Sequence, residues 1–221
     1  RDDVEFILCD GESHLLRCFL DYWIQNFPDI LTGWNVDGYD VPYICGRLER
    51  LFGEKEMKLM SPWGHVKREE VEIKGREQIF YRMSGISVID YLDLYKKFTY
   101  TNQESYRLDH IAFVELGQRK VAHDEFDNFK QFYTQDWQKF IDYNIVDVEL
   151  VSRLEEKMKL IELAVALAYD AKVNMQDVYY QVRMWDTLIY NFLNKKGIVV
   201  PPGKRSDKDE KYAGAYVKEP I

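Results

Sequence analysis

Cysteine is scarce in this sequence, and its spacing matches neither a disulfide framework nor a zinc motif. The three cysteines among 221 residues are Cys9, Cys18 and Cys45, with no Cys-x-x-Cys pair and no histidine at a matching spacing. A small odd number of cysteines is typical of a reducing compartment, so we expect buried free thiols. Long apolar runs are absent too, and nothing approaches the roughly 18 residues that a membrane-spanning helix needs. The sequence therefore predicts no membrane partner.

An excess of basic residues is also missing. With 30 basic and 38 acidic residues the net charge is −8, which argues against a general cationic nucleic-acid binder. The content of hydrophobic residues (46%) and aromatic residues (15%) excludes general disorder, because that much apolar material must be buried. The length suits one sizeable domain. The chain begins at Arg1 without methionine or a signal-peptide pattern, so we expect a piece of a longer protein.

Several motifs of nucleotide-binding and hydrolytic enzymes are absent. The sequence contains no GxGxxG, no GxxxxGK[ST], no GxSxG and no HExxH. The four histidines show no ligand spacing and are expected to be surface or core residues: His14, His65, His110 and His123. Carboxylates remain as the candidates for chemistry.

Strand-like and helical segments alternate in the first fifty residues. Val4–Cys9 and Ile30–Trp34 are short apolar runs typical of buried strands. Apolar residues between Leu15 and Trp23 recur at helical spacing, and a second helix is expected after Asp40. This alternation predicts an α/β fold with a parallel component.

The pattern changes after this part. Apolar and polar residues alternate over Val66–Met83 on both sides of Lys74-Gly75, which predicts a β-hairpin. Ile86–Ile89 predicts a further strand. The rest is expected to be mostly helical over residues 137–170, helical again over Val182–Leu193, and then a polar, lysine-rich loop over Gly203–Lys211.

The first candidate site lies in Gly33–Asp40, where a strand runs out into a turn and then a helix. Open α/β sheets bind ligands beyond the carboxyl ends of their strands, so Asn35 and Asp40 are well placed for a site. In the simpler interpretation, Asp40 is only the N-cap of the next helix, with Pro42 in its first turn.

The second candidate site is Tyr143-x-x-x-Asp147. Residues four apart share a helix face, so the Tyr143 hydroxyl and the Asp147 carboxylate can point into one cavity, as a divalent-metal site for phosphodiester hydrolysis requires. The simpler interpretation is a core tyrosine beside a solvated aspartate. A third candidate, the acidic pair Asp10 and Glu12, follows a predicted strand and opens a helix, so we interpret it as capping residues.

These motifs carry a resemblance to family B DNA polymerases, most closely those of the T-even type of tailed phages. Asn35-x-x-x-Tyr39-Asp40 resembles the second exonuclease motif of the family, and Tyr143-x-x-x-Asp147 resembles the third. Residues 85–98 and 101–106 are similar to a stretch typical of the phage enzymes. Residues 212–220 resemble the Tyr-Gly-Gly-type segment between exonuclease and polymerase domains, with Tyr212, Gly214 and Tyr216 as the expected DNA-binding residues.

The resemblance implies an α/β, ribonuclease-H-like 3′–5′ proofreading exonuclease domain over residues 1–170, incomplete at its N-terminal strands. It implies a helical connector and linker over 171–221. Mg²⁺ or Mn²⁺ is the implied cofactor: Asp147 would ligate the ion that activates water, Tyr143 would position that water, and Asp40 would serve the second ion. Asn35 and Tyr39 would shape the pocket for the terminal nucleotide. The hairpin corresponds in position to the family element that helps to separate primer from template, although it can equally be a plain surface hairpin.

Two departures from the family pattern matter. The first exonuclease motif, an Asp-x-Glu within a strand, is expected well upstream of the second, whereas Asp10 and Glu12 lie only about 30 residues before Asp40. The polymerase palm is absent as well. Two protein carboxylates should bind a divalent ion weakly, so we expect this chain alone to be a poor nuclease.

We therefore expect part of a phage replicative polymerase, working in the cytoplasm of an infected bacterial host. Its implied partners are a single-stranded primer end, primer–template DNA, an upstream first-motif segment and the downstream palm. The alternative is a non-catalytic DNA-binding or docking module, such as one half of a split polymerase, that keeps the fold without hydrolysis.

The distribution of charge leaves room for local DNA contacts. Residues 1–50 carry 4 basic and 10 acidic side chains, and residues 109–157 carry 6 and 11. The rest of the chain is slightly positive, and seven basic residues fall within 195–218 against three acidic ones. Phosphate contacts are expected beside that basic segment.

Overall fold

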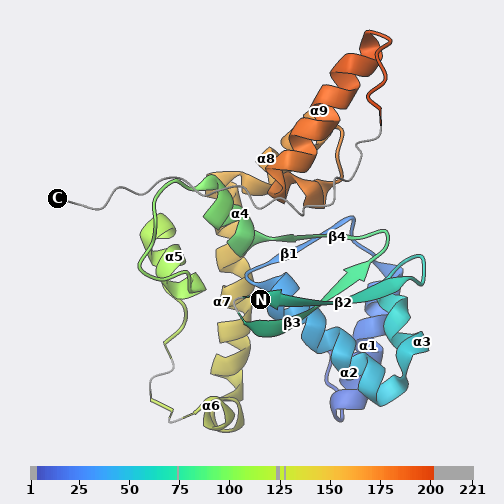
Figure 1. Cartoon of the computed structure of the whole chain (residues 1–221). Helices are drawn as coiled ribbons and strands as arrows, with labels where there is room; N and C mark the ends of the chain where they lie inside the picture. Colours follow the sequence, from blue (N-terminus) through green and yellow to red (C-terminus); the bar gives the residue numbers. More distant parts are fainter. Residues whose placement is uncertain (1–3, 74, 123–124, 127, 202–221) are drawn as a thin grey trace, which may run out of the picture.

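A computed structural model describes residues 4–73, 75–122, 125–126 and 128–201, which form a mixed α/β structure with little sheet and many helices (Figure 1). The elements follow one another as α1 (Glu12–Gln25), β1 (Ile30–Gly33), the helical turn η1 (Val36–Asp40), α2 (Val41–Phe52), α3 (Glu54–Met57), η2 (Lys58–Met60), β2 (Val66–Ile73), β3 (Arg76–Met83), β4 (Ser87–Asp90), α4 (Tyr91–Phe98), α5 (Leu108–Leu116), α6 (Phe129–Gln135), α7 (Trp137–Met158), α8 (Leu160–Ala171), η3 (Met175–Tyr179) and α9 (Gln181–Lys195). The predicted segments Gly203–Lys211 and 212–220 lie outside the described residues.

The strands form two separate pairs. β1 and β4 are parallel, with Ile30 opposite Ser87 and Gly33 opposite Asp90. β2 and β3 pair in antiparallel fashion, from Val66 opposite Met83 to Ile73 opposite Arg76, as the alternating sequence predicts. Gly75 lies in the connection with φ 76°, a conformation that favours glycine in a tight turn.

The predicted strand at Val4–Cys9 is wrong. These residues form no strand, and Phe6, Ile7 and Leu8 are 61%, 60% and 88% exposed. Apolar composition favours a strand only where another strand offers its backbone, and within the described residues β1 pairs with β4 alone. The expectation of buried thiols holds for Cys45 but is wrong for Cys9 and Cys18, which are partly exposed.

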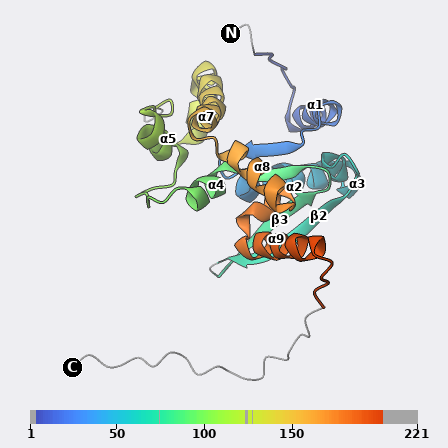
Figure 2. The same cartoon turned by 90° about the horizontal axis from the view of Figure 1, so that it is seen from above.

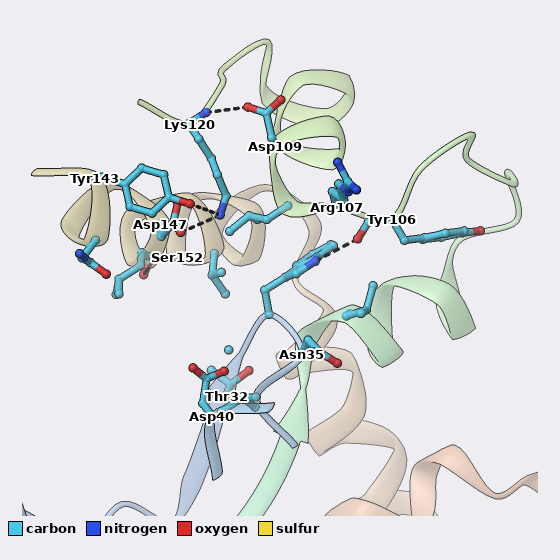
Figure 3. Close-up of a pocket in the computed structure, with 18 residues that line it drawn as sticks. Thr32, Asn35, Asp40, Tyr106, Arg107, Asp109, Lys120, Tyr143, Asp147 and Ser152 are labelled. Carbon is cyan, nitrogen blue, oxygen red and sulfur yellow. Dashed lines mark hydrogen bonds and ion pairs between the residues drawn. The ribbon is translucent and has the colours of Figure 1, made fainter. Parts of the chain in front are cut away.

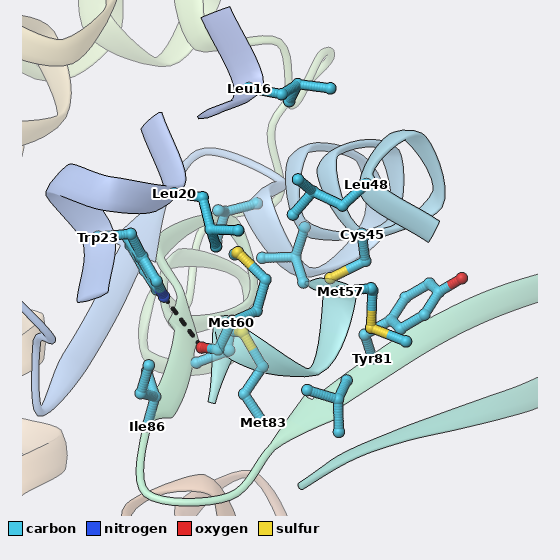
Figure 4. Close-up of a cluster of buried hydrophobic side chains, with 14 residues drawn as sticks. Leu16, Leu20, Trp23, Cys45, Leu48, Met57, Met60, Tyr81, Met83 and Ile86 are labelled. Carbon is cyan, nitrogen blue, oxygen red and sulfur yellow. Dashed lines mark hydrogen bonds between the residues drawn. The ribbon is translucent and has the colours of Figure 1, made fainter. Parts of the chain in front are cut away.

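Two hydrophobic cores flank the parallel pair. The first joins α1, α2 and the base of the hairpin, and the Trp23 indole donates a 2.9 Å hydrogen bond to the carbonyl of Met60 inside it (Figure 4). The second joins β4 and α4 to α5, α7 and α8 around Tyr91, Leu94 and Leu154. Figures 1 and 2 show α1–α3 on one side of the molecule and α5 and α7 on the other.

The predicted helices are confirmed. Residues 137–170 form α7 and α8, separated at Lys159, which takes the left-handed φ of 57°. The last predicted helix is α9, and none of its side chains is buried. Within the described residues, every helix is too short or too polar to cross a membrane.

Candidate functional site

A cavity of about 1020 Å³ opens between the end of β1, the start of α5 and the middle of α7 (Figure 3). It brings together four of the sequence-predicted site residues, from motifs about a hundred residues apart: Asn35, Asp40, Tyr143 and Asp147. The fifth residue of these motifs, Tyr39, does not line the cavity. Its ring is 63% exposed and stacks on Tyr43 at 6.1 Å between centroids. Tyr212, Gly214 and Tyr216 lie outside the described residues.

Asp40 lies directly before α2, with Pro42 in the first turn of that helix. Its backbone is already helical (φ −66°, ψ −48°), and its side chain makes no capping hydrogen bond. The carboxylate is therefore not used as a cap and is available to the cavity. Although the cavity admits solvent, desolvation by the surrounding wall raises the pKa of Asp40, against a smaller opposite effect of its own backbone N–H.

The segment that carries Asn35 and Asp40 is held in place by Asp90, at the end of β4. One Asp90 carboxylate oxygen accepts hydrogen bonds from the backbone N–H groups of Asn35 and Leu92, and the other accepts from Asp37, each at 3.0 Å. Asn35 takes the left-handed φ of 64°, which asparagine tolerates better than most residues. One buried carboxylate thus joins the two parallel strand ends to the turn η1.

The hairpin is tied to the same turn. Arg82 of β3 donates from Nη1 to both carboxylate oxygens of Asp37, at 2.7 and 3.0 Å. Burial raises the pKa of Asp37 more than the guanidinium lowers it. The turn η1 therefore binds the hairpin through Asp37 and forms part of the cavity wall through Asp40.

The opposite wall of the cavity is formed by α7, where Tyr143 and Asp147 share a face as their spacing predicts. Lys120 reaches both residues: its Nζ lies 2.6 Å from Asp147 Oδ2 and 3.3 Å from the Tyr143 hydroxyl. Burial lowers the pKa of Lys120, but the hydrogen bond and charge of Asp147, together with Tyr143, outweigh it and raise the pKa. Figure 3 shows Asp40 and Asn35 across the cavity from this group.

Sequence reasoning missed Lys120 and the residue that positions it. Asp109, at the start of α5, accepts a 2.9 Å hydrogen bond from the Lys120 backbone N–H and a second from Arg119. Neither Lys120 nor Asp109 belongs to a motif with recognisable spacing, because the contact joins α7 to a loop about 25 residues earlier. Arg107 also lines the cavity and is exposed.

One carboxylate oxygen of the cavity is suited to binding a divalent ion. Asp147 Oδ1 is buried and has no hydrogen-bond partner within the part of the chain that the structure describes. A buried carboxylate oxygen without a partner is costly, and a hard cation such as Mg²⁺ or Mn²⁺ would satisfy it. Asp147 is the residue that would hold such an ion, and Asp40, across the cavity, is the residue that would hold a second one. Among the described residues, no third acidic, histidine or cysteine side chain groups with them at ligand distance.

The third candidate, the acidic pair Asp10 and Glu12, does not line the cavity. α1 begins at Glu12 after Gly11, and no side chain caps it. Glu12 instead forms an ion pair with Arg47 of α2 through both carboxylate oxygens. The prediction of capping side chains is therefore wrong, because Glu12 pairs with Arg47 instead, although Glu12 does open the helix as an acidic residue of its first turn.

Removing the positive charge of Lys120 should strengthen divalent-metal binding. An ion must displace the ammonium group from Asp147 Oδ2, and a charge-assisted hydrogen bond contributes about 1.5–3 kcal/mol. We expect Lys120→Met to tighten Mn²⁺ binding by about tenfold, the equivalent of roughly 1.4 kcal/mol, as measured by calorimetric titration. Lys130→Met, at an exposed position of α6, is the matched control. Unchanged or weaker Mn²⁺ affinity in Lys120→Met would contradict this role for the ion pair.

The sequence of this chain is similar to that of known proteins. Residues 2–111 match the family model for the exonuclease domain of DNA polymerase family B. The DNA-directed DNA polymerase of Escherichia phage RB69 is 39% identical over 220 residues, and that of Enterobacteria phage T4 is 36% identical over 219. The DNA polymerase delta catalytic subunit of Drosophila melanogaster is 26% identical over 233 residues.

The coverage of these matches is unequal. They span 100%, 99% and 97% of this chain but only 24%, 24% and 20% of the respective relatives. This chain therefore spans about a quarter of the length of the phage polymerases it resembles. The chain belongs to the family B DNA polymerases and carries exonuclease-domain sequence of that family.

Proposed function

We propose that this chain contributes the 3′–5′ proofreading exonuclease of a phage replicative DNA polymerase. The observation that carries the proposal is the single cavity that Asn35 and Asp40 share with Tyr143 and Asp147. Two acids on opposite walls, one of them with a buried oxygen lacking a partner, are suited to a two-metal phosphodiesterase site. We assign a ribonuclease-H-like fold to residues 1–170, and to residues 171–221 a connector toward the palm.

We assign the roles of the side chains from the motifs to which they belong. Divalent ions would supply Lewis acidity and an activated water. Asp147 would ligate the first ion, and Tyr143, one turn away on α7, would orient the attacking water with its hydroxyl. Asp40, on the facing wall and without a capping role, would hold the second ion.

Substrate positioning falls to other residues in or beside the cavity. Asn35 would contact the terminal nucleotide, and Tyr39, exposed beside the cavity, would stack on a base or sugar. Arg107 offers an exposed guanidinium at the cavity wall, which suits a DNA phosphate. The hairpin β2–β3, anchored through Arg82 and Asp37, would help to separate the primer strand from the template. Tyr212, Gly214 and Tyr216 would contact DNA near the linker.

The site is incomplete as a nuclease. Two protein carboxylates bind Mg²⁺ or Mn²⁺ weakly, and Lys120 already neutralises one oxygen of Asp147. The proposed partners are an upstream segment bearing an Asp-x-Glu strand, the downstream palm, a single-stranded primer end and primer–template DNA. The proposed site of action is the cytoplasm of an infected bacterium.

Complementation tests this proposal. A 3′-labelled single-stranded oligonucleotide should be cleaved in Mg²⁺ or Mn²⁺ only when an upstream Asp-x-Glu segment is joined to the chain or added as a second polypeptide. Replacing both Asp40 and Asp147 by alanine should abolish the restored cleavage, whereas the control Asp142→Ala, on α7 but outside the cavity lining, should retain it. Restored cleavage that survives the double replacement would refute the site assignment.

The ion pair between Lys120 and Asp147 favours a second candidate, a docking or DNA-binding module without hydrolysis. This pair neutralises the α7 carboxylate without a metal ion. Under this alternative, the complemented chain binds the oligonucleotide and leaves it uncut at every metal concentration.

A further inference from the structure

A second group of potential metal ligands lies at the start of α1, among residues that do not line the cavity. The side chains of Cys9, His14 and Cys18 each offer one ligand atom, and these atoms all lie within 4.8 Å of one another. Among the described residues, no other group of three or more histidine, cysteine, aspartate or glutamate side chains brings its ligand atoms this close together. We propose that Cys9, His14 and Cys18 bind one thiophilic divalent cation of the Zn²⁺ class, which fastens the segment before α1 to that helix.

The backbone explains why residues with no recognisable spacing come together. His14 and Cys18 are four residues apart on α1 and therefore share one face of the helix. Gly11 precedes the helix with φ 156°, and its carbonyl accepts the Leu15 N–H at 2.9 Å. This turn places Cys9 beside the first turns of α1, so that the third ligand comes from outside the helix.

The chemistry of the ligands selects the metal. In a tetrahedral zinc site, with Zn–S of about 2.3 Å and Zn–N of about 2.0 Å, ligand atoms lie roughly 3.3–3.8 Å apart. Cys9 and Cys18 are partly exposed and His14 is exposed, so small side-chain rotations can close the remaining gap. Two thiolates and an imidazole favour Zn²⁺ or Co²⁺ over Mg²⁺, which prefers oxygen. Solvent reaches the group through His14, so water completes the fourth position.

The hydrogen bonding of His14 is compatible with this assignment. His14 Nδ1 accepts a 3.2 Å hydrogen bond from the Asp10 backbone N–H, so the neutral ring carries a lone pair on Nδ1. A metal bound at Nδ1 would take the place of this hydrogen bond. Each cysteine releases its proton to solvent as its sulfur–metal bond forms, so binding strengthens as pH rises.

Cobalt titration tests the proposal directly. The reduced 221-residue chain is titrated with Co²⁺ in excess Mg²⁺, which occupies oxygen sites, while thiolate-to-cobalt charge-transfer absorption is recorded. We expect saturation at an equimolar ratio, displacement of the signal by Zn²⁺, and a rise in Tm with Zn²⁺. Cys9→Ser and Cys18→Ser should each weaken binding at least about tenfold.

Two further variants separate loss of ligands from loss of folding. Cys45→Ala removes a thiol that is fully buried in the first core, and it should leave the titration unchanged. His14→Gln changes an exposed side chain and should fold normally, yet bind Co²⁺ more weakly and lose the Zn²⁺-dependent rise in Tm. Absence of the charge-transfer band in the reduced wild-type chain would overturn the proposal. An undiminished band in Cys18→Ser, or no weakening in His14→Gln, would also overturn it.

Discussion

Replacing Asp90 by alanine is expected to lower the free energy of unfolding by about 3 kcal/mol at neutral pH. The Asp90 carboxylate is 4% exposed and accepts three backbone hydrogen bonds, from Asn35, Asp37 and Leu92. Each amide left without an acceptor costs about 1–3 kcal/mol. The substitution also removes a buried charge, which offsets part of this loss of stability. Because the turn η1 depends on these bonds, the variant should also lose the geometry around Asp40.

The effect of Asp90→Ala should depend on pH in a defined direction. Burial raises the pKa of Asp90 to about 6, against the backbone hydrogen bonds that favour its ionised form. The native state therefore holds the Asp90 proton more tightly than the unfolded chain. The stability from this group is fully present below the unfolded pKa, and it is lost as pH rises through about 6.

Chemical denaturation at several pH values checks both statements. The difference in unfolding free energy between wild type and Asp90→Ala should widen as pH falls from about 7 to about 5. Asp186→Ala, on the exposed face of α9, should change stability by less than about 0.5 kcal/mol at each pH. A difference that stays constant or narrows as pH falls would show that Asp90 is not protonated more readily in the folded state.

Asp147→Asn is expected to reduce metal-dependent cleavage by the complemented chain by about 10²–10³-fold. The substitution keeps the shape of the side chain but removes the charge that would hold the ion beside Tyr143. Folding should be retained, because Asp147 lies 26% exposed at a cavity wall and Asn can still accept a hydrogen bond from Lys120. Single-turnover cleavage of a labelled oligonucleotide measures the effect.

Binding and chemistry should separate in this variant. Oligonucleotide affinity measured without metal should be unchanged or higher in Asp147→Asn, because a carboxylate that repels phosphate has been neutralised. Asp142→Asn, on the same helix but outside the cavity lining, should match wild type in both measurements. Cleavage by Asp147→Asn above a tenth of the wild-type rate would exclude Asp147 as an essential metal ligand.

Local patterns explain the parts of the fold that the sequence predicts. The hairpin Val66–Met83 follows from alternation and a glycine turn, both of which act between close neighbours in the chain. The long helix α7 follows from periodicity, and its spacing places Tyr143 and Asp147 on one face. The resemblance to family B polymerases brings the two motifs into one hypothesis, and the cavity brings four of their five polar residues together.

Contacts between distant segments explain the features that the sequence predicts wrongly or does not predict. Val4–Cys9 has the composition of a strand, but a strand requires a partner that local sequence does not specify. Lys120 reaches Asp147 from a loop that carries no motif, and Asp109 is needed to hold that loop. Helical spacing does relate His14 to Cys18, whereas the approach of Cys9 depends on the turn at Gly11.

The short parallel pair has a practical consequence for handling the chain in solution. Within the described residues, no strand pairs with the second edge of β1, and the apolar side chains Phe6, Ile7 and Leu8 are exposed. Unpaired edges and exposed apolar side chains are templates for aggregation. Measured affinities and melting temperatures of this polypeptide should therefore vary with its concentration. Values measured in dilute samples should be the closest to those of the monomer.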